Sequence, residues 1–460
     1  MKLTSSDQAD IAPGDLVRWH VEPVGRAESL STPLSENETF HLASNHSGTP
    51  GWIALTLDYA RPVARAAVDR VMRTLIERHD MLRSHFAAVD GGFTRVGYSA
   101  ARVVAREVRL SDAQSGPAFA DGLMSQIAGV CNPLRPMPHY LAAVERPDST
   151  TVILAFDHCY VDARALAVLG AETDELLAGR ELGKAESGLA AMSRTIAHDA
   201  GVTPDDWRLR GWRDFLAAAD WRVPEFPLDL GLPAGDTAPT HTQVRTLLPA
   251  EPAERLSSAV HQLGGRTYPA VLTCAGSAIA RLGGPAELGV VIPVPVVKSS
   301  RAVAWLVGSA PLRVDCAGAG LASAVQVNTA RLAAALPLAE IGLTPVYQAY
   351  GDRLRRARSD VFMMSYVDYT RLPGADAAAT AAQISSEKQS DTAQWWFWRD
   401  HAGIHVRVRH PHTEQAGQVI ARALEVTAAL MRDLAGPPPN PSDPVAGRPG
   451  AGQVDADPQG

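Results

Sequence analysis

The feature that most constrains the fold is a short apolar run that passes directly into a polar turn. Residues 151–156 (TVILAF) are apolar apart from Thr151, which predicts a buried strand. His158 follows the end of this strand, and Asp162 stands four positions later. The stretch 164–177 carries apolar side chains at helical spacing, so we expect a strand, a turn and a helix in succession. Such a turn can expose one imidazole in a cleft while a carboxylate braces it from behind.

A histidine in this position suggests proton transfer. Imidazole accepts a proton near neutral pH, so His158 is a candidate general base. The alternative is a satisfied core histidine at a strand end, which H-x-x-x-D alone would favour. Asp162 could orient the turn or simply cap the following helix. Asp157 could be a solvated loop carboxylate or could contact an acceptor, and Cys159 is more often a core residue than a nucleophile.

The length and charge of the chain exclude several classes of protein. A chain of 460 residues is too long for one ordinary core, so two lobes are expected. A net charge of -7 argues against a nucleic-acid partner, which would require a basic face. The four cysteines lie far apart and predict free thiols in a cytoplasmic protein rather than a redox or zinc site. No apolar stretch is long enough to span a bilayer, and the amino terminus lacks the apolar segment of a signal peptide.

Strand-like and helix-like segments alternate along the chain, which indicates an α/β fold. We expect strands at 53–58, 93–96, 103–108, 139–144, 151–156, 244–248, 289–297 and 361–368, with a last pair formed by 395–398 and 404–408. We expect helices at 63–79, 164–177, 209–219, 253–263, 270–282 and 418–434.

The division into lobes follows from composition. Residues 1–182 form the predicted N-terminal lobe, which contains the H-x-x-x-D pattern, and 207–435 form the C-terminal lobe. The polar, glycine-containing stretch 183–206 is the expected linker. Gly and Pro are so frequent in 436–460 that we expect a disordered tail.

Several segments besides the H-x-x-x-D pattern resemble one superfamily. It contains chloramphenicol acetyltransferase, the condensation domains of nonribosomal peptide synthetases and the polyketide-associated acyltransferases. The similar segments are ERHDMLRSHF at 77–86, LAAV at 141–144, VG at 307–308 with PLRV at 311–314, and MSYVDY at 364–369. The likeness to actinobacterial polyketide-associated acyltransferases is closer still, through PGDLVRWH at 13–20, WRDF at 212–215 and PEFPL at 224–228. It extends to about residue 434.

The resemblance implies two chloramphenicol-acetyltransferase-like lobes, each a mixed β-sheet covered by helices, with an active-site tunnel between them. It places His158 in the middle of the tunnel, with Asp162 as a structural brace. It also implies that the strand around Gln394 and Trp396 borders the tunnel, so these two side chains and Asp157 are candidate substrate contacts.

Three positions depart from the motif of that superfamily. Asp157 stands where a first histidine is frequent, and Ala163 replaces a glycine. The motif aspartate usually pairs with an arginine of the second lobe, and no arginine stands in the matching segment. Lys298 and Arg301 are the candidate substitutes.

The chemistry implied is transfer of an acyl group from a thioester to a hydroxyl, in lipid or polyketide assembly. The donor would be an acyl-CoA or the phosphopantetheinyl group of an acyl carrier protein, with no tightly bound cofactor and no metal. A monomer is adequate, since two lobes of one chain build the cleft. Two alternatives stay open, namely a free-standing condensation enzyme that forms an amide and a non-catalytic relative that binds a carrier protein.

His405, His410 and His412 are interpreted as a surface strand end rather than a metal site.

Overall fold

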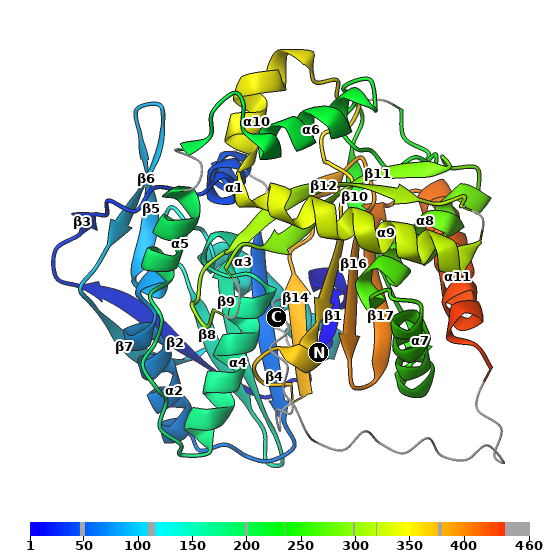
Figure 1. Ribbon diagram of the computed structural model, residues 1–460. Coiled ribbons are helices and arrows are strands. Elements are labelled where there is room, and N and C mark those ends of the chain that lie inside the picture. Colours follow the sequence, from blue (N-terminus) through cyan, green and yellow to red (C-terminus); the bar gives the residue numbers. More distant parts are fainter. Residues whose placement is uncertain are drawn as a thin grey trace, which may run out of the picture.

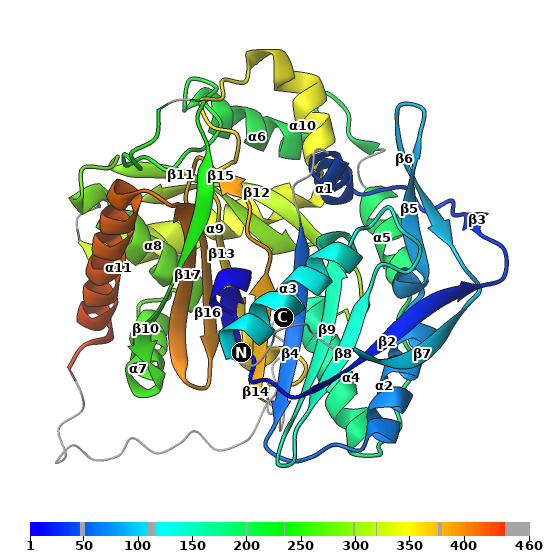
Figure 2. The same ribbon diagram turned by 180° about the vertical axis from the view of Figure 1, so that it is seen from behind.

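The computed structural model describes residues 1–46, 51–108, 116–197, 201–233, 235–297, 300–318, 320–375 and 380–437. Figure 1 shows two lobes side by side, each built on a β-sheet with helices packed against it. The amino terminus lies between the two lobes in both side views (Figures 1 and 2).

The first lobe is built on a seven-stranded mixed sheet with the strand order β1-β14-β4-β9-β8-β2-β7. Helices α2 (Arg65–Arg78) and α4 (Ala163–Leu177) pack on one face, and α3 (Gly116–Val130) packs on the other. Because both faces are covered, every residue of β9 is buried, which explains its continuous apolar sequence. The strands are β1 (Lys2–Ser5), β2 (Asp15–Val24), β4 (Trp52–Tyr59), β7 (Ala100–Val108), β8 (Tyr140–Glu145), β9 (Thr150–Asp157) and β14 (Thr380–Ser385).

A small three-stranded sheet extends this lobe at its outer edge (Figure 1). It consists of β3 (Glu28–Ser29), β6 (Gly92–Gly97) and β5 (Ser84–Val89). A fully buried ion pair between Arg95 and Glu38, with an N–O distance of 2.6 Å, ties the sheet to α1 (Glu36–His46). This pair fixes α1 next to the end of β9.

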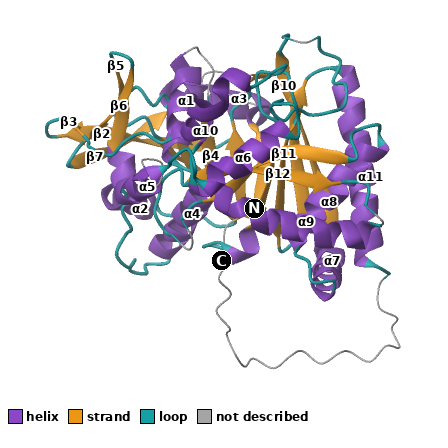
Figure 3. Ribbon diagram, turned by 45° about the horizontal axis from the view of Figure 1, so that its top comes forward, coloured by secondary structure: helices purple, strands orange, loops and turns teal. Residues whose placement is uncertain are grey.

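The second lobe contains a five-stranded sheet with the order β13-β16-β17-β10-β15 and a two-stranded ribbon. Helices α7 (Ala250–Gln262), α8 (Thr267–Arg281) and α11 (Glu414–Ala435) cover one face of the larger sheet and form the main core with it. Figure 3 shows these helices gathered on one side of the strands. The strands are β10 (Ala238–Pro249), β13 (Met364–Asp368), β15 (Gln389–Ser390), β16 (Gln394–Asp400) and β17 (Gly403–Pro411), with β11 (Glu287–Pro295) and β12 (Val307–Asp315) in the ribbon.

The remaining helices lie around the ribbon. Helix α9 (Leu321–Ala335) packs along β12, and α6 (Trp207–Ala217) and α10 (Leu343–Tyr350) share a small core of their own. All four cysteines are free and buried, as expected from their spacing.

The predicted helices and strands form with shifts of a few residues at their ends, and several further elements were not expected, among them α3, α9, β12 and β14. The segment 183–206, predicted as an irregular linker, contains α5 (Gly188–Ala197). The N-terminal stretch of mixed composition contains α1. Of the predicted disordered tail, only residues 436 and 437 lie within the described part of the chain.

One strand of the later half lies in the sheet of the first lobe. β14 pairs with β4 in antiparallel orientation and with β1 in parallel orientation, although the chain reaches it only after most of the second lobe. The other face of the second sheet therefore looks toward β1 and β14. Trp398 on that face donates a hydrogen bond to the Met1 carbonyl at 2.9 Å.

Candidate active site

His158 begins a short turn directly after β9. The turn, a 3-10 helix at His158–Tyr160, leads into α4. The backbone N–H of His158 donates to the carbonyl of Gly51 at 2.9 Å. Its imidazole lies against the indole of Trp305, with 4.0 Å between ring centroids and 31° between planes. Nδ1 is buried and has no hydrogen-bond partner among the described residues.

The surroundings of His158 keep its imidazole neutral. Burial and then the neighbouring His41 ring lower the pKa of His158 from 6.5 to about 4, and the Asp157 carboxylate acts in the opposite direction. A neutral imidazole retains a lone pair at physiological pH. Proton acceptance, the requirement for a general base, is therefore available to this side chain.

Asp162 connects the two lobes. One carboxylate oxygen caps α4 by accepting from the N–H of Ala165 at 2.8 Å, and the other accepts from the N–H of Leu306 at 3.0 Å. Both sequence interpretations of Asp162 therefore apply, since it caps the helix and braces the turn. Burial outweighs these hydrogen bonds and raises the pKa of Asp162 above its usual value.

The described donor to Asp162 from the second lobe is the backbone amide of Leu306 and not an arginine. Arg301 is exposed, and its electrostatic effect falls on Glu175 rather than on Asp162. Lys298, the other candidate, lies outside the described residues. An amide needs no counter-charge, so this brace operates without a buried ion pair.

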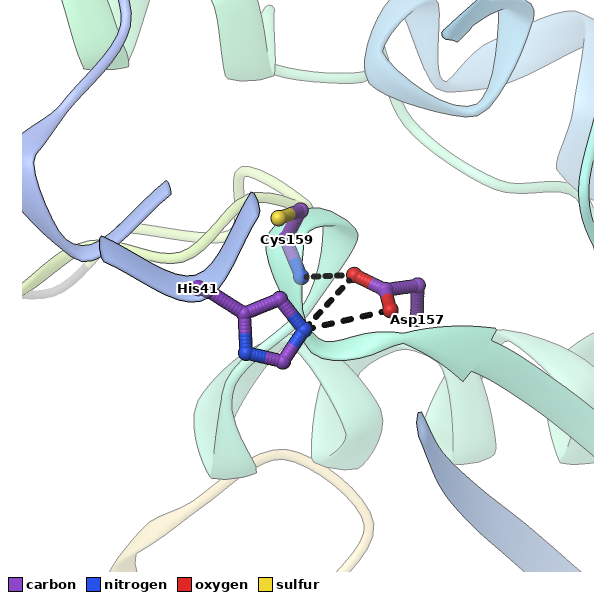
Figure 4. Close-up of side chains that lie close together, drawn as sticks. All are labelled: His41, Asp157 and Cys159. Carbon is purple, nitrogen blue, oxygen red and sulfur yellow. Dashed lines mark hydrogen bonds and ion pairs between the residues drawn. The ribbon is translucent and has the colours of Figure 1, made fainter. Parts of the chain in front are cut away.

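Asp157 is fully buried, which corrects the interpretation of it as a solvated loop carboxylate. Its oxygens lie 3.0 and 3.1 Å from Nε2 of His41, and one of them accepts from the N–H of Cys159 at 3.0 Å (Figure 4). The close approach of His41 depends on Gly51, because a Cβ added there would lie 1.9 Å from the His41 Cε1. A contact of Asp157 with substrate stays a prediction.

The His41, Asp157 and Cys159 side chains also have the donor types of a metal site. Their ligand atoms lie within 4.8 Å of one another, the only such cluster in the described part of the chain. However, the carboxylate already accepts from His41 and from a backbone N–H, and Figure 4 shows the Cys159 sulfur pointing away from it. Burial raises the pKa of the Cys159 thiol well above its ordinary value, which opposes the thiolate that a metal needs. The arrangement fits a hydrogen-bonded pair.

Gln394 and Trp396 lie on the face of the second sheet that looks toward the first lobe. The guanidinium groups of Arg407 and Arg409 approach the Trp396 ring, with centroid distances of 5.0 and 5.1 Å. Arg409 donates to the Gln394 side chain, and Arg407 donates to the Ser385 hydroxyl at 2.6 Å. The substrate roles of Gln394 and Trp396 stay predictions, but both residues belong to one cluster with these arginines.

The sequence analysis missed His41 and Trp305, which both contact the His158 ring. Their ring centroids lie 6.2 Å and 4.0 Å from that of His158. Neither lies near the H-x-x-x-D pattern along the chain. The one available signal was Asp157 itself, because a buried carboxylate requires a basic or donor partner, although the partner's position could not be deduced.

None of the described helices combines the length and apolar character needed to cross a bilayer.

No protein-family model matches the chain. Two groups of mycobacterial proteins are similar in sequence. PapA1 of Mycobacterium tuberculosis, a 2'-acyl-2-O-sulfo-trehalose (hydroxy)phthioceranyltransferase, is 24% identical over 69% of this chain and 65% of its own length. PapA2 of Mycobacterium bovis, a trehalose-2-sulfate acyltransferase, is 24% identical over 68% of this chain and 71% of its own. The matched region thus spans slightly less than two thirds of PapA1.

Solved structures share the fold. A PapA2 acyl transferase superposes with a TM-score of 0.85 at 22% identity and covers 95% of this chain and 100% of its own. The first condensation domain of the CDA synthetase gives a TM-score of 0.70 at 17% identity, covering 89% and 98%. The condensation domain of the polyketide synthase MokA gives 0.68 at 13% identity, covering 90% and 99%. The predicted fold, and the predicted resemblance to polyketide-associated acyltransferases and condensation domains, are confirmed.

Proposed function

We propose that this protein is an acyltransferase that moves an acyl group from a thioester to a hydroxyl and so forms an ester, in lipid or natural-product biosynthesis. The observation that carries the proposal is the neutral imidazole of His158, held at the junction of the lobes by the Asp162 contact with Leu306. The sequence similarity of this chain to PapA1 and PapA2 supports the same reaction class. Their names make a sugar hydroxyl the first acceptor to try.

In the proposed reaction His158 accepts the proton of the acceptor hydroxyl while the oxygen attacks the thioester carbonyl. The tetrahedral intermediate then collapses, the carbon–sulfur bond breaks, and the departing thiolate takes the proton from the imidazolium. No covalent acyl-enzyme is needed. The nearby Asp157 carboxylate favours the imidazolium electrostatically, because it raises the pKa of His158. Asp162 acts as a positioning residue.

The donor is proposed to be an acyl-CoA or the phosphopantetheinyl arm of an acyl carrier protein, which enters as a substrate. The cytoplasmic location and the monomeric state also stay predictions. An amine acceptor would make the same demand on His158, so amide formation is the second candidate. A purely binding role is less well supported, because the brace of Asp162 persists through the Leu306 amide.

The test is release of free thiol from a panel of acyl-CoA and acyl-carrier thioesters, with and without pooled hydroxyl and amine acceptors. Wild type is compared with His158→Ala and with His261→Gln, a control on the exposed side of α7. We expect acceptor-dependent release that His158→Ala abolishes and His261→Gln preserves. Release that survives His158→Ala would contradict the mechanism, and the acceptor pool that supports release separates ester from amide formation.

A further inference from the structure

Two arginines occupy the inter-lobe face of the second sheet. Arg407 and Arg409 alternate along β17, so their side chains leave the sheet on the same side, while Val406 and Val408 point into the core. Both guanidinium groups lie near the ring of Trp396 on β16. Figures 1 and 2 both place β16 and β17 next to β1 and β14 of the first lobe.

Neither arginine has a carboxylate partner within the described residues. Each guanidinium makes one side-chain hydrogen bond to a neutral group, Ser385 for Arg407 and Gln394 for Arg409. The Nε atoms of both are buried without a partner, and Arg407 is only 3% exposed. Buried charges are normally paired, because removing an ion from water into the protein interior is costly in free energy. Burial accordingly lowers the pKa of Arg407 to about 9 and of Arg409 to about 10.

Within the described residues, no nearby acidic group forms an ion pair with either arginine. Asp7 and Glu387 act on Arg407 from a distance, and burial together with Asp7 raises the pKa of Glu387 to about 7, so that it is partly protonated near neutral pH. Asp360 acts on Arg409 but is already paired with Lys388 at 3.2 Å. The pair of guanidinium groups therefore keeps unused hydrogen-bond donors and positive charge inside the molecule.

The sheet register relates this cationic cluster to the candidate base. Ser385, the partner of Arg407, is aligned with Ile53 of β4, and Ile53 is aligned with Phe156 of β9. Phe156 precedes His158 by two residues. Two strand spacings separate the backbones of Ser385 and Phe156 by about 10 Å. A sugar with a substituent spans a separation of this size.

We propose that Arg407 and Arg409 bind an oxyanion substituent, a sulfate, phosphate or carboxylate, on the acceptor whose hydroxyl is presented to His158. A guanidinium offers two parallel N–H donors that match two oxygens of such a group, and the tetrahedral or planar oxyanion would supply the missing counter-charge. This inference rests on the proposed function for the role of His158, but the binding step can be tested without turnover.

The test measures binding of four probes to the full chain by titration calorimetry: glucose 6-sulfate, glucose 6-phosphate, glucuronate and glucose. The variants are Arg407→Gln, Arg409→Gln and the double substitution. Arg399→Gln serves as the matched control, because Arg399 lies on the neighbouring β16 and pairs with Glu254. We expect wild type and Arg399→Gln to bind at least one anionic probe tenfold or more tightly than glucose, and the Gln variants to lose that preference.

A wild type that prefers no anionic probe over glucose, or Gln variants that retain the preference, would overturn the inference. If the double variant does not fold, Arg409→Gln alone decides, because its described hydrogen bond reaches only Gln394 of its own sheet. His158→Ala separates the two proposals, since it should bind the anionic probes as wild type does. Anion binding without thiol release from any donor would contradict the proposed function and leave the anion site standing.

Discussion

The carboxylate of Asp157 lies 3.0 Å from Nε2 of His41, and this contact joins α1 to the strand that presents His158. The two groups influence His158 in opposite directions, because the carboxylate raises its pKa and the His41 ring lowers it. The aspartate at the first motif position is thus paired here with a histidine from another element.

Because Asp157 and His41 act on His158 in opposite directions, their removal should shift the pKa of His158 in opposite directions. Asp157→Asn should lower the pKa of His158 further, and His41→Gln should raise it, as measured by NMR titration of labelled histidine. A shift of one pKa unit corresponds to about 1.4 kcal/mol, so Asp157→Asn should reduce kcat by roughly tenfold with little change in KM. His261→Gln should leave both quantities unaltered. Shifts in the same direction would show that the pair acts only through packing.

Gly51 should be intolerant of any side chain. A methyl group there would overlap the His41 ring, so Gly51→Ala should destabilise the fold by about 1–3 kcal/mol, as overpacking does. Adding His41→Ala should relieve most of this loss, while Gly92→Ala should cost little because open space surrounds a Cβ at that position. The free energies of unfolding come from urea denaturation. A double variant no more stable than Gly51→Ala would refute the overlap.

Loss of the Asp162 brace should be costly. Asp162→Ala leaves the N–H groups of Ala165 and Leu306 buried without an acceptor, and at about 1–3 kcal/mol each the loss should reach about 2–6 kcal/mol. Asp162→Asn keeps one acceptor oxygen and should lose about half as much. Asp206→Ala, which removes the cap of α6, provides a reference of about 1 kcal/mol. Equal losses for Asp162→Ala and Asp206→Ala would argue against the contact between the lobes.

Trp305 should control the basicity of His158. The indole covers the imidazole, and burial is the main cause of the lowered pKa, so Trp305→Ala should move the pKa from about 4 toward 6.5. Activity of wild type should rise as the pH passes about 4 and then stay level, whereas the acidic limb of Trp305→Ala should lie at higher pH. Trp207→Ala, at an exposed position on α6, should match wild type. An unmoved acidic limb would contradict the assignment of His158 as the base.

Acid should destabilise the protein between pH 6.5 and about 4. Burial lowers the pKa of His139 and of His410 to about 4, as it does for His158. In this window the unfolded chain binds more protons than the folded one, so stability is complete above pH 6.5 and is lost as the pH falls. Each such group contributes up to about 3 kcal/mol. His139→Gln should flatten the dependence of the unfolding free energy on pH. An unchanged slope of unfolding free energy against pH would contradict the contribution assigned to His139.

The sequence predicted the parts of the structure that depend on local pattern. The apolar strand, the turn and the amphipathic helix around His158 follow from residue order, and the capping role of Asp162 follows from its place before α4. The contacts that complete the site could not be deduced. His41 and Asp157 are separated by 116 residues, and Trp305 arrives from the second lobe. Only the packing of α1, fixed by the buried Arg95–Glu38 pair, brings His41 to Asp157.

The position of β14 has a consequence for the order of folding. The sheet of the first lobe cannot be completed until residues 380–385 have been synthesised, because β4 has no other neighbour on that side and β1 pairs with β14. A nascent chain that ended before this strand would expose the unpaired backbone of β4, which is a template for association with other strands. The lobe that contains His158 is therefore not an independent folding unit, because its sheet includes a strand that follows β10, β11, β12 and β13 of the second lobe along the chain.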